Sequence, residues 1–354
     1  KVITDCNFIS GAQVSELEKN LADYVGVKHC ISCGNGTDAL TMMMMAWGIK
    51  EGDAVFVPDF TFFASGEIVS FEGATPVFYD VCEDTFNADV VSLEKVIQAV
   101  IDEGKLTPKV IIGVDLFGLP ADYRAIQKVA EKYDLLVLED GAQGFGGMIG
   151  DKRACSFGDA ATTSFFPAKP LGCYGDGGAV FTNDDEVADY LRSIRVHGKG
   201  AFKYDNVRIG WNSRLDTIQA AILQVKFKAF AEYELKNINS VAEQYTKELE
   251  GIVKVPRIKE GFYSSWAQYT IQLESKKQRD DLQAYLKEAG IPTMVYYPKP
   301  MHQQLAFGQN KIYAECLVSE RLCDTVLSLP IHPYIEKKDI RMIIDKVKFF
   351  LRND

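Results

Sequence analysis

Short, almost wholly apolar runs alternate with helical patterns through the first two thirds of this chain. The runs are bounded by Asp, Pro or Gly and cover residues 54–58, 76–81, 110–115, 135–139, 160–166 and 179–182. Strands that are buried on both faces of a parallel sheet have this continuous apolar character. Helical patterns lie between several of the runs, at residues 63–71, 91–101, 121–132 and 186–194. The sequence therefore predicts an α/β fold with a large, doubly wound, mostly parallel sheet.

The last third of the chain has a different pattern. Residues 216–249 form one long helical pattern, with room for a single break. A strand pattern at 267–273, a helix at 277–289, a polar, proline-punctuated loop at 297–309 and a closing helix at 338–351 follow. A chain of 354 residues is long enough for about two domains. We predict a large domain at 1–234 and a small C-terminal α+β domain at 235–354, with the long helix as the connector.

Charge and composition exclude several classes of protein. The net charge of −10 argues against a nucleic-acid-binding protein, which needs a basic face. No apolar run approaches the roughly 20 residues that span a bilayer. The eight cysteines are scattered, and Cys30 and Cys33 form a lone pair without a second pair nearby, so we expect buried thiols and no metal site. No signal peptide is visible, and a reducing, cytoplasmic compartment is expected.

The glycine-rich segment at residues 34–39 (GNGTDA) precedes a helical pattern. Glycines let backbone N–H groups approach an anion, and a helix N-terminus favours negative charge, so the segment is a candidate phosphate site. It also matches the dinucleotide fingerprint of nicotinamide oxidoreductases, with Asp59 as the acidic residue. Lys28 and His29 are poor residues for the central strand that this fingerprint requires. A tight turn with a helix cap is a third interpretation.

Two further residues have chemistry that complements a phosphate site. Asp140 ends a predicted strand, where ligand groups gather in open α/β sheets. Lys169 lies in a Pro- and Gly-rich loop after a buried strand, and a desolvated lysine amine can form a Schiff base with an aldehyde. Each alone could be a turn carboxylate or a solvated lysine. Together, an amine, a carboxylate and an anion cradle are what pyridoxal 5′-phosphate (PLP) requires.

Seven motifs resemble those of the DegT/DnrJ/EryC1/StrS family of nucleotide-sugar aminotransferases, in the family's order and over nearly the whole chain. They are NGTDAL (35–40), PDFTF (58–62), EDGAQ (139–143), SFFPAK (164–169), GDGGA (175–179), GWNSRL (210–215) and SLPIHP (328–333). The resemblance implies the PLP-dependent transferase fold type I. It also implies a homodimer with shared active sites.

The resemblance implies a role for individual residues. Lys169 would carry the cofactor and move the proton, Asp140 would hold the pyridine nitrogen protonated, Gln143 would bind the phenolic oxygen and Phe62 would stack on the ring. The phosphate would be held by Gly36, Thr37, Ser164 and, from the partner subunit, Asn212.

The implied reaction is a ping-pong transfer of an amino group from glutamate to a keto group of a nucleotide-linked sugar, in the synthesis of surface glycan precursors. The run at residues 166–178 (FPAKPLGCYGDGG) is most similar to that of family members that act on the 3-keto position of a UDP-N-acetyl hexuluronate, so the resemblance implies this substrate. Arg214, Tyr296 and Tyr297 are the candidate substrate residues, and His197 and His302 are further candidates for sugar contact. A 3- or 4-aminotransferase for a dTDP- or UDP-keto-6-deoxyhexose remains the alternative, and an NAD-dependent oxidoreductase is a distant one.

Overall fold

The computed structural model describes residues 1–202 and 204–353, and its core is a seven-stranded sheet with the order β1-β9-β8-β5-β4-β2-β3. The strands are β1 (His29–Cys33), β2 (Asp53–Pro58), β3 (Thr75–Tyr79), β4 (Thr107–Val114), β5 (Leu136–Asp140), β8 (Ala160–Ser164) and β9 (Gly178–Thr182). The pairs β2–β3, β2–β4, β4–β5 and β5–β8 are parallel, whereas β9 is antiparallel to both β8 and β1. All six predicted strands are present, and the mostly parallel sheet is confirmed.

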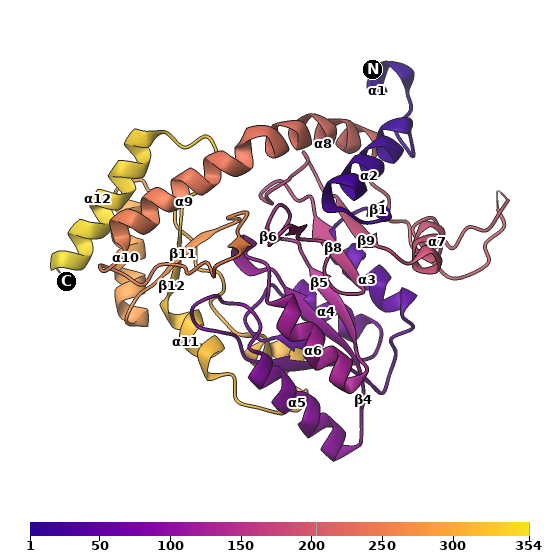
Figure 1. Cartoon of the computed structure of the whole chain (residues 1–354), viewed down its shortest axis with the longest axis horizontal. Helices are drawn as coiled ribbons and strands as arrows, with labels where there is room; N and C mark the ends of the chain where they lie inside the picture. Colours follow the sequence, from indigo (N-terminus) through magenta and orange to yellow (C-terminus); the bar gives the residue numbers. More distant parts are fainter. Residues whose placement is uncertain (203, 354) are drawn as a thin grey trace.

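Helices cover both faces of this sheet (Figure 1). They are α2 (Ala12–Val25), α3 (Gly36–Ala46), α4 (Ala64–Phe71), α5 (Val90–Glu103), α6 (Tyr123–Tyr133) and α7 (Asp185–Ile194), after a short α1 (Val2–Asp5). Strand β2 shows why its sequence is apolar throughout. Val55 and Val57 join a hydrophobic cluster with α3, α4 and α7, and Phe56 joins another with α5 and α6. Because successive side chains point to opposite faces, a strand covered on both faces has no polar positions.

A long helix connects the sheet to the C-terminal elements (Figure 1). It consists of α8 (Thr217–Ala229), a π-helical turn (Phe230–Glu234) and α9 (Leu235–Leu249), so the predicted helix widens at one point instead of breaking. The remaining elements are α10 (Lys276–Glu288), α11 (Leu317–Thr325), α12 (Lys337–Asn353) and the antiparallel pair β11 (Tyr269–Gln272) and β12 (Val326–Leu329). A hydrophobic cluster of buried residues in the range 241–347 joins α9, α10, α12, β11 and β12, whereas Leu322 and Cys323 of α11 belong to a cluster of the large sheet. The division into domains at residue 234 stays a prediction.

A small sheet and a projecting segment lie outside the main sheet and the C-terminal elements. A small sheet is formed by β6 (Met148–Ile149), β7 (Lys152–Arg153) and β10 (Phe262–Tyr263). The chain after α7 projects away from the sheet (Figure 1) and exposes apolar side chains. Within the described ranges, no helix is both long enough and apolar enough to cross a bilayer.

Candidate active site

The carboxyl ends of β5 and β8 place Asp140 and Ser164 at one edge of the sheet. The strands are parallel neighbours, and Asp140 lies opposite Thr162 in the register. The Asp140 carboxylate is buried and accepts hydrogen bonds from the Ser65 hydroxyl (2.7 Å) and the Ala142 N–H (3.2 Å). Burial raises the pKa of Asp140, and these hydrogen bonds and the charge of Lys169 oppose that rise. Asp140 is thus a carboxylate with fixed geometry at the position where open α/β sheets bind ligands.

Lys169 lies in the loop after β8 and faces Asp140. The Lys169 N–H donates to the Phe166 carbonyl at 2.8 Å, which fixes the loop backbone. Burial lowers the pKa of the Lys169 amine, and the neighbouring Asp140 carboxylate opposes that shift. The amine is therefore desolvated and interacts electrostatically with the Asp140 carboxylate. Such an amine is easier to deprotonate than a solvated one, as a nucleophilic lysine requires.

The glycine-rich segment meets the end of β8 at the start of α3. The Asn35 carboxamide caps this helix by accepting the Asp38 N–H at 2.8 Å. A Cβ atom on Gly36 would lie only 2.7 Å from the Ser164 Cβ, so glycine is needed for this close approach. The backbone N–H groups at the first turn of a helix lack partners within the helix. Gly36, Thr37 and the Ser164 hydroxyl therefore form a cradle suited to a phosphate.

The same segment does not have the topology of a dinucleotide site. That fingerprint needs a strand–helix–strand unit whose strands run parallel in the sheet. Here β1, which precedes the glycines, lies at the edge of the sheet and pairs antiparallel with β9. The oxidoreductase alternative and the plain-turn interpretation both fail to account for the nearby Lys169 and Asp140.

Ser213 ties the segment around Asn212 and Arg214 to this cradle. Its hydroxyl donates to the Asp38 carboxylate (2.6 Å) and accepts the Gly34 N–H (2.8 Å). The Asn212 side chain is exposed, and Arg214 is half-buried. Arg214 forms no ion pair with any residue that the structure describes. Its guanidinium is therefore available to an acidic ligand.

Gln143, Phe62 and Tyr297 form the opposite side of the site. The Gln143 side chain accepts the Phe117 N–H (2.7 Å) and donates to the Tyr297 hydroxyl (3.0 Å). The Tyr297 ring lies 6.2 Å from the Phe62 ring and 5.8 Å from the Tyr296 ring, and burial raises the pKa of the Tyr297 phenol. The Phe62 side chain is 53% exposed, which leaves a ring face free for stacking. The C-terminal loop thus closes onto residues of the large sheet.

Sequence analysis missed two of these positions. Ser65, a polar residue inside a helical pattern, carries no motif that would reveal its bond to Asp140. Ser213 lies within a recognised motif, but its partner Asp38 is 175 positions away. His302 pairs with the buried Asp59, and its role in sugar contact stays a prediction. The described parts of the structure place His197 on the exposed segment after α7.

These residues fit PLP because an amine, a carboxylate and a phosphate cradle converge at one sheet edge. When bound, PLP supplies an aldehyde to the amine and a ring that withdraws electrons from the substrate. The fold and the site define a PLP-dependent enzyme of fold type I. The chain belongs to the DegT/DnrJ/EryC1/StrS aminotransferase family, whose model matches residues 1–348. It is therefore a PLP-dependent aminotransferase, as predicted.

Individual relatives cover almost the whole chain. A UDP-2-acetamido-2-deoxy-3-oxo-D-glucuronate aminotransferase of Pseudomonas aeruginosa is 45% identical over 97% of this chain and 92% of its own length. A UDP-N-acetyl-3-dehydro-alpha-D-glucosamine 3-aminotransferase of Acidithiobacillus ferrooxidans is 39% identical over 98% and 91%. The crystal structure of a family aminotransferase from Brucella abortus is 49% identical, has a TM-score of 0.96 and matches 99% of this chain and 93% of its own.

Proposed function

We propose that the enzyme transfers an amino group from glutamate to the 3-keto position of a UDP-N-acetyl hexuluronate, for the synthesis of surface glycan precursors. The desolvated Lys169 amine facing Asp140 carries the assignment of aminotransfer. The names of the two similar relatives support amination at position 3 of a UDP-sugar. The eight free thiols are in keeping with a reducing cytoplasm.

Each residue of the site has its own role in the reaction. Lys169 binds the cofactor and, once free, moves a proton as general base and acid. Asp140 keeps a positive charge on the cofactor's ring nitrogen, and the Ser65 bond holds its carboxylate in place. Gly36, Thr37 and Ser164 hold the phosphate. Phe62 would stack on the ring, and Gln143, which has one carboxamide N–H left after its bond to Tyr297, would bind the phenolic oxygen.

Substrate choice depends on Arg214 and the two tyrosines. A guanidinium without a protein carboxylate partner can form a bidentate pair with the sugar's C6 carboxylate or with that of glutamate. Tyr296 and Tyr297 form the wall next to Gln143, where the keto carbon must arrive. A 6-deoxyhexose would lack the carboxylate and leave this pairing unused, which makes the 3- or 4-amination of such sugars the weaker alternative.

Purified enzyme with glutamate and a panel of keto sugars tests this proposal. We expect turnover with UDP-2-acetamido-2-deoxy-3-oxo-D-glucuronate and much weaker turnover with dTDP- or UDP-keto-6-deoxyhexoses, with mass spectrometry of the product as the measurement. Arg214→Gln should raise KM for the hexuluronate about tenfold or more, because a charged hydrogen bond is lost. Lys152→Gln, a change of an exposed cation, is the control. Preferential amination of a 6-deoxyhexose would contradict the substrate assignment.

We also propose that two chains form a dimer in which each site uses Asn212 of the partner subunit. Within the described chain, the segment after α7 exposes Phe202, Val207, Ile209 and Trp211, a set of apolar side chains suited to an interface. Asn212 follows this set directly and is itself exposed. An isologous dimer would cover both segments at once.

Mixing two inactive variants tests the shared site. We expect a hybrid of Lys169→Ala and Asn212→Ala chains to regain activity, because one of its two sites then combines an intact Lys169 with an intact Asn212. Each homodimer alone should have little or none. Activity of refolded mixtures is the measurement, and a double variant on one chain mixed with wild type is the control. No recovery in the hybrid would place Asn212 outside the partner's site.

A further inference from the structure

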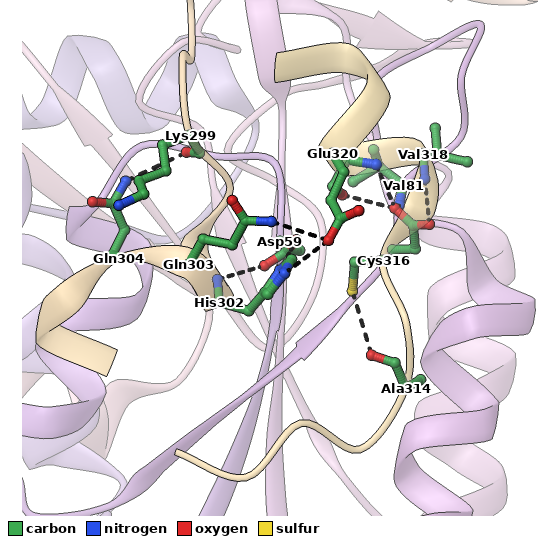
Figure 2. A network of polar contacts seen from close by, with 12 residues as sticks. Asp59, Val81, Lys299, His302, Gln303, Gln304, Ala314, Cys316, Val318 and Glu320 are labelled. Atoms are coloured by element: carbon green, nitrogen blue, oxygen red, sulfur yellow. Dashed lines mark hydrogen bonds and ion pairs between the residues drawn. The ribbon is translucent and has the colours of Figure 1, made fainter. Parts of the chain in front are cut away.

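A second polar cluster lies behind the active site, where the C-terminal loop meets strand β2 (Figure 2). Asp59 follows β2 directly and is fully buried. Its carboxylate accepts the His302 N–H at 2.8 Å and faces the His302 Nδ1 at 2.7 Å, and its carbonyl accepts the Met301 N–H at 2.9 Å. Three contacts therefore attach residues 301–302 to the residue that begins the segment Asp59–Ser65.

The other ring nitrogen of His302 also faces a carboxylate. Its Nε2 lies 3.2 Å from a carboxylate oxygen of Glu320 on α11, and Gln303 donates to the same oxygen at 3.0 Å. A neutral imidazole has one N–H, so only the imidazolium donates to both partners. The hydrogen bond to Asp59 raises the pKa of His302, burial opposes this, and Glu320 adds to the rise. The charged ring thus links β2, the C-terminal loop and α11.

The remaining polar groups around His302 leave Asp59 as its main partner. Asp80, behind Asp59, is engaged by the Val318 and Ser319 N–H groups at 2.9 Å. The thiol of Cys316 is buried, and together with Lys311 and Tyr313 it lines the small hollow beside the ring. The polar atoms of Asp59, His302 and Cys316 lie within 4.8 Å of one another. The hydrogen bonds of Asp59 account for this clustering.

Two residues of the same loop, Met301 and Tyr297, connect the contacts at Asp59 to the active site. Met301 packs on α4, where a Cβ atom on Gly66 would lie 2.6 Å from the Met301 side chain. Gly66 follows Ser65, which holds the Asp140 carboxylate. In the other direction along the loop, the Tyr297 hydroxyl accepts a hydrogen bond from the Gln143 side chain at 3.0 Å. The segment 297–302 therefore contacts α4 next to Ser65 at one end and Gln143 at the other.

We propose that His302 is a positioning residue: by binding Asp59 and Glu320 it holds the segment 297–302 in place and thereby fixes Tyr297 at the substrate side of the site. This inference rests on the proposed role of that site. The Asp59 bond is the essential one, because it joins the loop to the large sheet, whereas Glu320 lies nearer the surface. Below the pKa of His302 the charged ring donates to both carboxylates, and as pH rises through that pKa the bond to Glu320 is lost while the neutral ring keeps the bond to Asp59.

Three substitutions separate the two bonds. The side-chain amide of His302→Asn can replace Nδ1 toward Asp59, that of His302→Gln can replace Nε2 toward Glu320, and His302→Ala replaces neither. We expect His302→Ala and His302→Gln to raise KM for the nucleotide sugar about tenfold with a smaller change in kcat. His302→Asn should restore most of the affinity. KM of the wild type should change little as pH rises through the His302 titration, because the neutral ring can keep its N–H toward Asp59.

Alkylation of Cys316 gives a readout that is independent of turnover. The thiol is 3% exposed beneath the loop, whereas Cys6 is exposed and serves as an internal reference. In His302→Ala, peptide mass spectrometry should show Cys316 labelled much faster relative to Cys6, with or without PLP. His29→Asn is the matched control, because His29 forms a similar 2.7 Å pair with Asp185 at the surface, away from the site. It should change neither KM nor labelling.

Two outcomes would overturn the inference: unchanged Cys316 labelling in His302→Ala, or rescue by His302→Gln equal to that by His302→Asn. The Asn and Gln variants keep the comparison decisive if His302→Ala does not fold. Failure of the proposed function is distinguishable, since it would appear as absent turnover in the wild type while the labelling result still reports on the loop.

Discussion

Replacement of Lys169 by alanine is expected to abolish aminotransfer and the yellow colour of the purified enzyme, while the chain still folds. The amine is the only group of the site that can be joined covalently to the PLP aldehyde, and no neighbouring lysine takes its place in the described loop. Its desolvation means that removing the amine also removes an unfavourable burial, so the fold should not suffer. Activity, visible absorbance and thermal unfolding are the three measurements.

Reduction with borohydride sharpens this test. In the wild type, a pyridoxyl group should be fixed on the peptide that contains Lys169, and peptide mass spectrometry should find it nowhere else. Lys152→Ala, at the exposed short strand β7, is the matched control and should keep colour and rate. Full turnover by Lys169→Ala, or a pyridoxyl group on another lysine, would contradict the assignment of the whole site.

The sheet could be predicted from the sequence because burial on both faces leaves a strong signal. Strands such as β2 and β4 have apolar side chains on both faces, so their runs are continuous and easily bounded. The direction of a strand leaves no such signal in its own residues. Only the 13 residues between β8 and β9 point to the reversal of β9, since they contain no helix, and a parallel connection needs a crossover of a dozen or more residues, usually helical.

The C-terminal elements were predicted less completely for a similar reason. Strand β12 has four residues, Val326–Leu329, and follows α11 without an intervening loop. A run this short shows neither alternation nor a helical period, and it was read only as part of a motif. Pairing with β11, more than 50 positions earlier, makes it a strand. That pairing is a tertiary contact, which local pattern does not encode.

The residues of the candidate site could be predicted from the sequence, whereas the contacts between them could not. Residue types within motifs, such as Asp140 at a strand end, could be selected from their chemistry, and the family resemblance supplied their roles. Contacts across the chain could not be predicted: Ser65 to Asp140, Ser213 to Asp38, and His302 to Asp59. These contacts orient the predicted residues. The sequence thus indicates which groups act, and the fold determines how they are held.

The substitution Asp140→Asn is expected to leave the cofactor bound and the enzyme coloured but to lower kcat on the order of 10²–10³-fold or more. The amide has the shape of the carboxylate: its single oxygen can accept the Ala142 N–H while its NH2 group donates to the Ser65 hydroxyl. It lacks the charge that keeps the ring nitrogen protonated, so the ring withdraws electrons less strongly when the proton leaves the substrate. The substitution should also lower the pKa of Lys169 below its value in the wild type, because the charge of the Asp140 carboxylate raises that pKa.

Ser65→Ala is the matched comparison, because it removes a 2.7 Å bond to the carboxylate and keeps the charge. If charge is what Asp140 contributes, Ser65→Ala should cost only about tenfold in kcat, far less than Asp140→Asn. If orientation is what matters, Ser65→Ala should be the slower of the two variants. Single-turnover rates with glutamate, followed by the loss of visible absorbance, distinguish these outcomes without the nucleotide sugar. A near-normal rate for Asp140→Asn would mean that another group holds the ring nitrogen, and the residues that face Lys169 would then have to be reassigned.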